Sequence, residues 1–360
     1  MREFHHLTVA TVFALVLTSA TVAGAFHDGG VGSCSGCHVI HDSRDGIPVA
    51  LDGVGLPLLI RATPTDVCLS CHAEDQGMVL GSDPLSPPPQ RGGGNFVHLF
   101  EDDINDAAEA VAPIGGHRCG HNVISVAYGL DVDPDLPVAP GGSYPAADLG
   151  CTSCHDPHGN GNFRLLRGAG DVGGFVFASG APTAEGVELT GAAETPTNHT
   201  AYRSGWSAWC ANCHGYYHRS QWADFKHPVD RAVGRFVAEA YNAYAGDANP
   251  TGGLYATAGL PEVPVQDSSA EVSGMSGANT SSRLNCMSCH RAHATSAPAA
   301  LRWDPRVLHL AQDGLVSGSY PIPSPYLDLD QRSLCVKCHW QDAGNHGLDR
   351  PCLECHAAAD

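Results

Sequence analysis

The chain has 360 residues and a net charge of −19 at pH 7. This charge argues against nucleic acid as a partner and favours cationic partners such as metal ions or mineral surfaces. Glycine (42 residues) and proline (25 residues) are too frequent for long helices or a large regular sheet. The composition therefore predicts a mostly irregular fold with short helices.

The first 25 residues are typical of a secretory signal peptide. Arg2 begins a short basic region, an apolar stretch covers residues 7–22, and Ala23-Gly24-Ala25 offers a cleavage site before Phe26. The apolar stretch is shorter than the roughly 20 residues that span a bilayer, which argues against a membrane anchor. We therefore expect residues 26–360 to be exported through the periplasm as a soluble chain, either secreted or held at the cell surface.

Fourteen of the fifteen cysteines lie in seven copies of Cys-x-x-Cys-His, the attachment signature of c-type haem. The two thiols bind the vinyl groups of one porphyrin, and the histidine binds its iron as the proximal ligand. Zinc gives no reason for a histidine in the fifth place seven times, and a redox dithiol would occur once. The cysteine pairs are Cys34 and Cys37, Cys68 and Cys71, Cys151 and Cys154, Cys210 and Cys213, Cys286 and Cys289, Cys335 and Cys338, and Cys352 and Cys355. The proximal histidines are His38, His72, His155, His214, His290, His339 and His356.

Seven covalently bound haems would supply the core that the polypeptide lacks. Because porphyrins are rigid and apolar, we expect the chain to wrap them as loops and single turns and not to fold without them. No break in composition divides residues 26–360, so one heptahaem domain is predicted. Within it, the spacing of Val233, Phe236, Val237, Tyr241 and Tyr244 predicts an amphipathic helix over residues 231–244, and residues 174–190 predict a hairpin.

Twelve histidines remain outside the motifs and residues 1–25, a surplus over the seven distal positions. Two axial histidines close an iron and suit it to electron transfer. In three motifs a second histidine follows the proximal one after two residues, and it cannot reach round its own porphyrin, so it must bind the iron of another haem. Such a link would hold two irons close together, with their porphyrins stacked. The second histidines are His41, His158 and His293.

Several segments resemble extracellular, filament-forming multihaem cytochromes of metal-reducing bacteria (cytochrome nanowires). They are residues 26–31 with the first motif, Gly120-His-Asn-Val, the loop Ala139-Pro-Gly-Gly before the third motif, Gly205-Trp-Ser-Ala-Trp before the fourth, Lys226-His-Pro-Val after it, and Leu301-Arg-Trp-Asp. The resemblance implies a homopolymer in which the haems form one unbroken stacked chain. It also implies that His41 is donated to a haem of the neighbouring protomer.

The predicted distal ligands are His41, His121, His158, His218, His227, His293 and His346. His121 and His227 depend on the segments that match the resemblance, and His346 is the histidine between the last two motifs. The alternatives are His27, His98, His117, His199 and His309. Cys119, the cysteine outside the motifs, is expected to be a buried reduced thiol, with a thiolate ligand as the alternative.

Three functions remain open. The resemblance favours an electron conduit that polymerises into extracellular filaments and passes electrons to redox partner proteins or metal oxides. A monomeric periplasmic electron carrier is the alternative. A multihaem oxidoreductase is least favoured, because it needs an open iron and usually a lysine in place of a proximal histidine, whereas all seven motifs keep the histidine. The prediction is an electron-transfer protein and not an enzyme.

Overall fold

The computed structural model describes residues 27, 34–39, 43–44, 47–48, 58–73, 79–89, 91–101, 113–187, 193–218, 229–313, 326, 331–332 and 334–339. Most of these residues lie in loops, which confirms the irregular fold expected from the composition. None of the helices in this part of the chain is long and apolar enough to cross a membrane.

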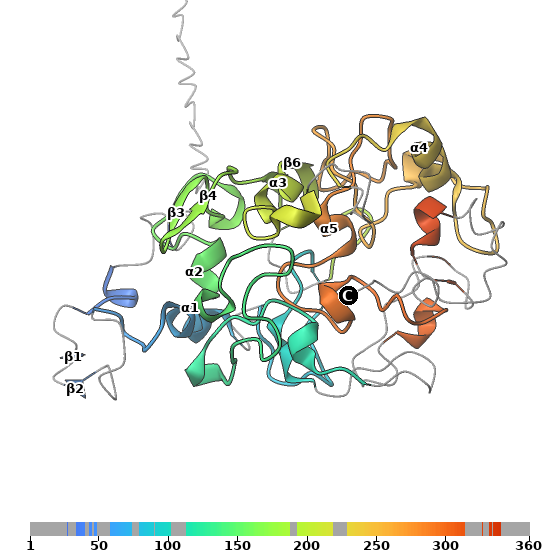
Figure 1. The fold of residues 1–360 in the computed structure, drawn as a ribbon. Helices are drawn as coiled ribbons and strands as arrows, with labels where there is room; N and C mark the ends of the chain where they lie inside the picture. The colour runs from blue at the N-terminus through green and yellow to red at the C-terminus, as the bar shows by residue number, and fades with distance from the viewer. Residues whose placement is uncertain are drawn as a thin grey trace, which may run out of the picture.

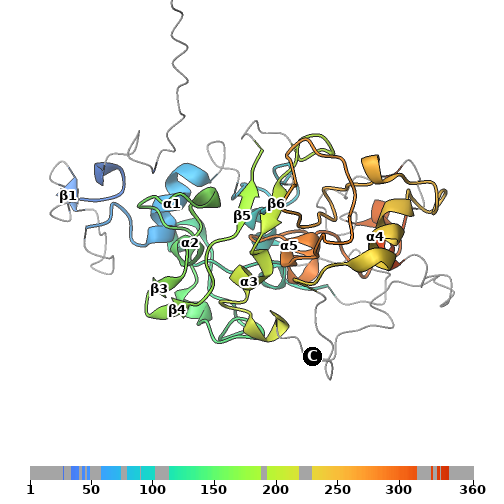
Figure 2. The ribbon, with the colours of Figure 1, turned by 90° about the horizontal axis from the view of Figure 1, so that it is seen from above.

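The regular elements are short. The helices are α1 (Pro64–His72), α2 (Cys151–Cys154), α3 (Trp206–Cys210), α4 (Gly234–Ala243) and α5 (Cys286–Cys289). Three antiparallel ribbons pair β1 (Ser43–Arg44) with β2 (Ile47–Pro48), β3 (Gly170–Val172) with β4 (Phe175–Phe177), and β5 (Thr183–Glu185) with β6 (Ala201–Ser204). In both views the helices follow one another along the long direction of the molecule, from α1 and α2, which lie side by side, through α3 and α5 to α4, and β1 lies beyond α1 (Figures 1 and 2).

The predicted amphipathic helix is confirmed as α4, which begins at Gly234, where φ is +70°, and ends at Ala243. Its Ala238 and Tyr241 side chains are buried, as the helical spacing requires. Phe236 was expected on the same face, but it is 82% exposed. The residue lies on the far side of a helix that begins three residues later than predicted.

The hairpin predicted over residues 174–190 has a different pairing. Phe175–Phe177 pairs with the preceding strand, Gly170–Val172, through a turn at Gly173 and Gly174, both of which have positive φ. The downstream strand Thr183–Glu185 pairs with Ala201–Ser204. Because two adjacent glycines adopt positive φ without steric cost, the tight turn forms upstream of the predicted one.

The apolar core of the described residues is divided into small clusters, one of which is bordered by motif cysteines. Tyr241, Leu310 and Leu334 lie in one cluster, and Cys289 and Cys338 pack against it. A second cluster surrounds Leu69 of α1 and a third surrounds Trp206 of α3. The polypeptide thus packs around each motif locally, which leaves the space between clusters to be filled by the groups that the thiols carry.

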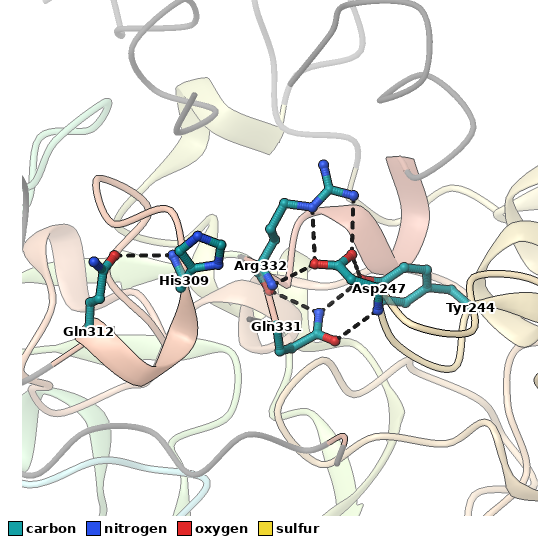
Figure 3. A network of polar contacts seen from close by, with 6 residues as sticks. All are labelled: Tyr244, Asp247, His309, Gln312, Gln331 and Arg332. Carbon is teal, nitrogen blue, oxygen red and sulfur yellow. Dashed lines mark hydrogen bonds and ion pairs between the residues drawn. The ribbon is translucent and has the colours of Figure 1, made fainter. Parts of the chain in front are cut away.

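A polar network joins the end of α4 to the segment that leads into the sixth motif (Figure 3). Arg332 donates from Nε to Asp247 Oδ2 (3.0 Å) and from Nη2 to Oδ1 (3.1 Å), and its backbone N–H also donates to Oδ2 (2.8 Å). The Tyr244 hydroxyl donates to Asp247 and accepts from Gln331 Nε2 (2.8 Å). Although burial acts to raise the pKa of Asp247, the bonds from Arg332 and Tyr244 lower it below its usual range. His309 lies beside the network, and its backbone forms an isolated antiparallel β-bridge with that of Arg332.

Substitution Asp247→Asn should lower the free energy of unfolding by about 2 kcal/mol, because hydrogen bonds to charged groups contribute about 1.5–3 kcal/mol each. Chemical denaturation of the haem-loaded protein measures this. The matched control is Glu239→Gln on α4, whose pair with Arg235 is exposed to solvent, so this variant should unfold like the wild type.

The same pair of proteins should show a defined pH dependence. Since the pKa of Asp247 is lowered on folding, its stabilisation is complete above the unfolded value of 3.8 and is lost as the pH falls through the folded value. Equal stability of the wild type and the Asp247→Asn variant at pH 6 would contradict the role of the network.

Candidate haem sites

Each described motif forms one helical turn. In five of them the backbone N–H of the histidine donates to the carbonyl of the first cysteine at 2.8–3.1 Å. The second motif ends helix α1. One turn brings the two cysteines onto the same face, as two thioether bonds to one porphyrin require. The seventh motif, with Cys352, Cys355 and His356, lies outside the described residues.

Side chains hold the start of these turns. Thr63 caps α1 by accepting from the backbone N–H of Asp66 (3.1 Å), while the Asp66 side chain accepts from that of Thr63 (3.1 Å). Asn285 accepts from Met287 (2.7 Å) at the start of α5, and Ser288 accepts from Asn285 (3.1 Å). These reciprocal caps stabilise helices that are too short to form by propensity alone.

The motifs lie next to one another in the order of the sequence. From the first to the sixth, each has a thiol within hydrogen-bonding or electrostatic range of a thiol in the next. The pairs are Cys37 and Cys68, Cys68 and Cys151, Cys154 and Cys213, Cys210 and Cys286, and Cys289 and Cys335. The arrangement of α1, α2, α3 and α5 in Figures 1 and 2 shows the same line.

Loop carbonyls orient the proximal imidazoles. A carbonyl can only accept, so each ring that contacts one through Nδ1 carries its proton there, and Nε2 is then the nitrogen that can bind a metal. The contacts are His38 to Leu58 (3.2 Å), His155 to Arg164 (2.8 Å), His214 to Pro140 (2.8 Å) and His290 to Ala299 (2.8 Å).

Two predicted distal ligands have the same anchor. His121 Nδ1 donates to the Ala292 carbonyl (2.6 Å), and His293 Nδ1 donates to that of Gly94 (3.2 Å). Burial lowers the pKa of both imidazoles to about 4. Both rings are therefore neutral at physiological pH, which is the form that binds a metal.

Three pairs of imidazoles have centroid separations close to that of two ligands of one metal ion. A metal–nitrogen bond is about 2 Å, so two imidazoles on opposite sides of one metal ion have centroids about 6 Å apart. The observed separations and interplanar angles are 6.2 Å and 23° for His27 and His72, 6.2 Å and 13° for His38 and His158, and 5.8 Å and 52° for His121 and His214. The chain's own residues therefore fit bis-histidine haem.

His27, which the sequence left among the alternatives, is thus brought to the second motif. Its position one residue after the predicted cleavage site gave no signal for this, because the partner, His72, lies 45 residues away and no spacing rule connects them. His158 is brought to the first motif, as the argument that it must bind another haem requires.

The other candidates have different surroundings. His218 Nε2 contacts Asp230 (2.9 Å) and His117 Nε2 contacts Asp135 (2.9 Å). His98 is buried against Glu101, and His199 Nδ1 contacts the Thr195 carbonyl (3.2 Å). His41, His227 and His346 lie outside the described residues.

Cys119 is completely buried between His117 and His121. Burial raises the pKa of its thiol far above the usual value, and Glu101 acts in the same direction. The thiol is therefore protonated at physiological pH, which matches the expected reduced cysteine and not a thiolate ligand.

Known proteins share the Cys-x-x-Cys-His motifs and the sequence around them. A family model for a doubled CXXCH motif matches residues 144–172. The chain is 29% identical over 437 aligned positions to C-type cytochrome OmcS of Geobacter sulfurreducens, covering 95% of this chain and all of that protein.

Two solved structures of filaments have a similar fold. The structure of OmcS nanowires from Geobacter sulfurreducens, determined by cryo-electron microscopy, has a TM-score of 0.72 at 26% identity, covering 87% of this chain and 99% of that one. The outer membrane cytochrome S filament of the same organism has a TM-score of 0.72 at 27% identity, with the same coverage. The resemblance predicted from the sequence is confirmed: this chain is a relative of the multihaem c-type cytochromes that form filaments.

Proposed function

We propose that this protein carries seven covalently bound haems on residues 26–360 and polymerises outside the cell into a filament that conducts electrons to redox partners or metal oxides. The observation that carries the proposal is the line of adjacent motifs, in which the proximal imidazoles of His38, His155, His214 and His290 are each anchored at Nδ1 by a backbone carbonyl. Haem supplies one-electron iron chemistry there, and the protein residues hold each iron closed between two imidazoles. The filaments formed by its relatives favour this function over a monomeric periplasmic carrier.

The geometry supports specific distal ligands for four motifs. We assign His158 to the first motif, His27 to the second and His121 to the fourth, on the paired rings. His293, whose nearest charge interaction is with His155, is assigned to the third. Three positions remain, and the candidates for them are His41, His227, His346 and His218. His218 is the weakest of the set, since its Nε2 already contacts Asp230.

All irons should be low-spin and six-coordinate, because each lies between two imidazoles. Electron paramagnetic resonance of the oxidised protein measures the spin state, and quantitation of haem gives the expected seven per chain. A high-spin ferric signal of one haem per chain would contradict the conduit and support an oxidoreductase with an open iron.

Substitution His27→Ala should convert one haem per chain to a five-coordinate or water-ligated state, because it removes the ring that faces His72. The second motif keeps its own histidine and both thiols, so haem loading should not change. The matched control is His117→Ala, which removes a ring whose Nε2 binds Asp135, and this variant should remain entirely low-spin. An all-low-spin His27→Ala variant would refute the pairing.

Substitution His41→Ala should leave haem loading of the monomer unchanged but abolish polymerisation, and one haem per protomer should lose its sixth ligand. The physical reason is that His41 cannot reach round the porphyrin held by His38, and the resemblance implies that it binds a haem of the next protomer. Negative-stain electron microscopy and spin state are measured on one preparation. Normal filaments with all haems low-spin would exclude the assignment.

A further inference from the structure

Three motifs share one backbone arrangement downstream of their histidines. In each, a downstream leucine forms an isolated antiparallel β-bridge with the proximal histidine. The residue after this leucine donates its backbone N–H to the carbonyl of the second cysteine. The bridges join His38 with Leu59, His155 with Leu166, and His290 with Leu301. The bonds are Ile60 to Cys37 (3.0 Å), Arg167 to Cys154 (2.9 Å) and Arg302 to Cys289 (2.8 Å). Ile60, Arg167 and Arg302 therefore occupy equivalent places.

The side chains at this place differ in charge. Arg167 Nε donates to the Thr152 carbonyl (2.6 Å), and Arg302 Nε donates to the Met287 carbonyl (2.6 Å). Thr152 and Met287 are the same position of the motif, directly after its first cysteine. Ile60 at the first motif is apolar and buried. The first motif thus has no charge where the third and the fifth have a guanidinium.

The two guanidinium groups also differ in exposure. Arg302 is 1% exposed, while Arg167 is half-buried. The other bonds of Arg302 run from Nη1 to the Pro261 carbonyl (3.0 Å) and from Nη2 to the Tyr202 hydroxyl (3.0 Å). All three acceptors are electrically neutral, and a guanidinium does not lose its proton in proteins. Arg302 is therefore a permanent buried charge that is attached to the backbone of the fifth motif.

A fixed positive charge in a medium of low dielectric constant stabilises an electron placed next to it. Reduction converts ferric to ferrous iron by one electron, which an adjacent haem of the conduit supplies. We propose that the residue in this place sets the reduction potential of the haem on its motif, so that the potential is highest at the fifth motif, intermediate at the third and lowest at the first. The proposal deepens the proposed function and rests on haem attachment at these motifs.

The negative charge of one carboxyl group opposes the effect of Arg302 on the reduction potential. Glu262 has an oxygen, Oε2, that is buried without a hydrogen bond, and its charge interacts with Arg291 and Arg302. Where this carboxyl is ionised it stabilises the ferric form. Its removal should therefore shift the potential in the direction opposite to the removal of Arg302.

Potentiometric titration of the haem-loaded protein, followed by absorbance, tests the proposal. Arg302→Gln should lower the reduction equilibrium constant of one haem about tenfold, which is 59 mV for a one-electron couple. Arg167→Gln should lower that of another haem by less, because water screens its charge. Arg302→Lys keeps the charge and should retain most of the potential, and Glu262→Gln should raise it. The control is Arg61→Gln, which removes an exposed arginine beside Ile60 and should shift nothing.

Haem content measured on the same samples separates this inference from the proposed function. If the wild-type protein contains no haem, the proposed function is refuted, whereas the role of the charge is judged only on samples that contain haem. A fully loaded Arg302→Gln protein that titrates like the wild type would overturn the inference. So would an Arg302→Lys protein with the same shift as Arg302→Gln, since packing and not charge would then be responsible. If Arg302→Gln does not load haem, an unshifted Arg167→Gln protein overturns the inference.

Discussion

The constraint on which this fold depends is that backbone carbonyls orient the imidazoles, by accepting from Nδ1 of six of the histidines predicted to bind iron. Carbonyls inside regular helices and sheets are already bonded, so the acceptors must lie elsewhere. Those of Leu58, Gly94, Pro140 and Ala292 lie in loops, and those of Arg164 and Ala299 lie in short 3-10 turns at residues with positive φ. One of these loops approaches a motif so closely that only glycine fits. A Cβ at Gly142 would lie 1.5 Å from the Cys213 carbonyl oxygen, beside the Pro140 carbonyl that holds His214. The abundance of glycine and proline is thus a requirement of the haem sites.

The described polypeptide contributes little continuous core of its own. Its buried apolar side chains form small clusters, each bordered by motif cysteines or by residues next to them. Short helices of four or five residues persist because side-chain caps and the motif turns hold them. Order therefore comes from local packing around each motif, with polar networks such as the one around Asp247 joining distant segments.

The motifs, the irregular fold and helix α4 could be predicted from the sequence, because each depends on residues close together in the chain. The sequence also predicts that His158 binds the iron of another haem, because a porphyrin is too wide for a residue so close to His155 to reach round it. The pairing of His27 with His72 was not, because it depends on how loops far apart in the sequence approach each other. The pairing of β4 with β3 was not predicted, because it depends on the turn at Gly173 and Gly174, which begins upstream of the predicted hairpin. Phe236 lies outside the core because it is two residues from Ala238 and five from Tyr241, which places its side chain on the opposite side of α4.

The spatial order of the first six motifs is collinear with the sequence, and this has a consequence for how such a chain can change. From the first motif to the sixth, a thiol of each motif interacts with a thiol of the next one along the primary structure. Gene duplication of one segment, with its motif and its returning loop, would insert a unit into the line and would also have to preserve links that skip a motif, such as that of His158 with His38. The similar backbone around the third and fifth motifs is what such a duplication would leave behind. The reach of the molecule can thus evolve in whole haem steps, independently of the surfaces at its two ends.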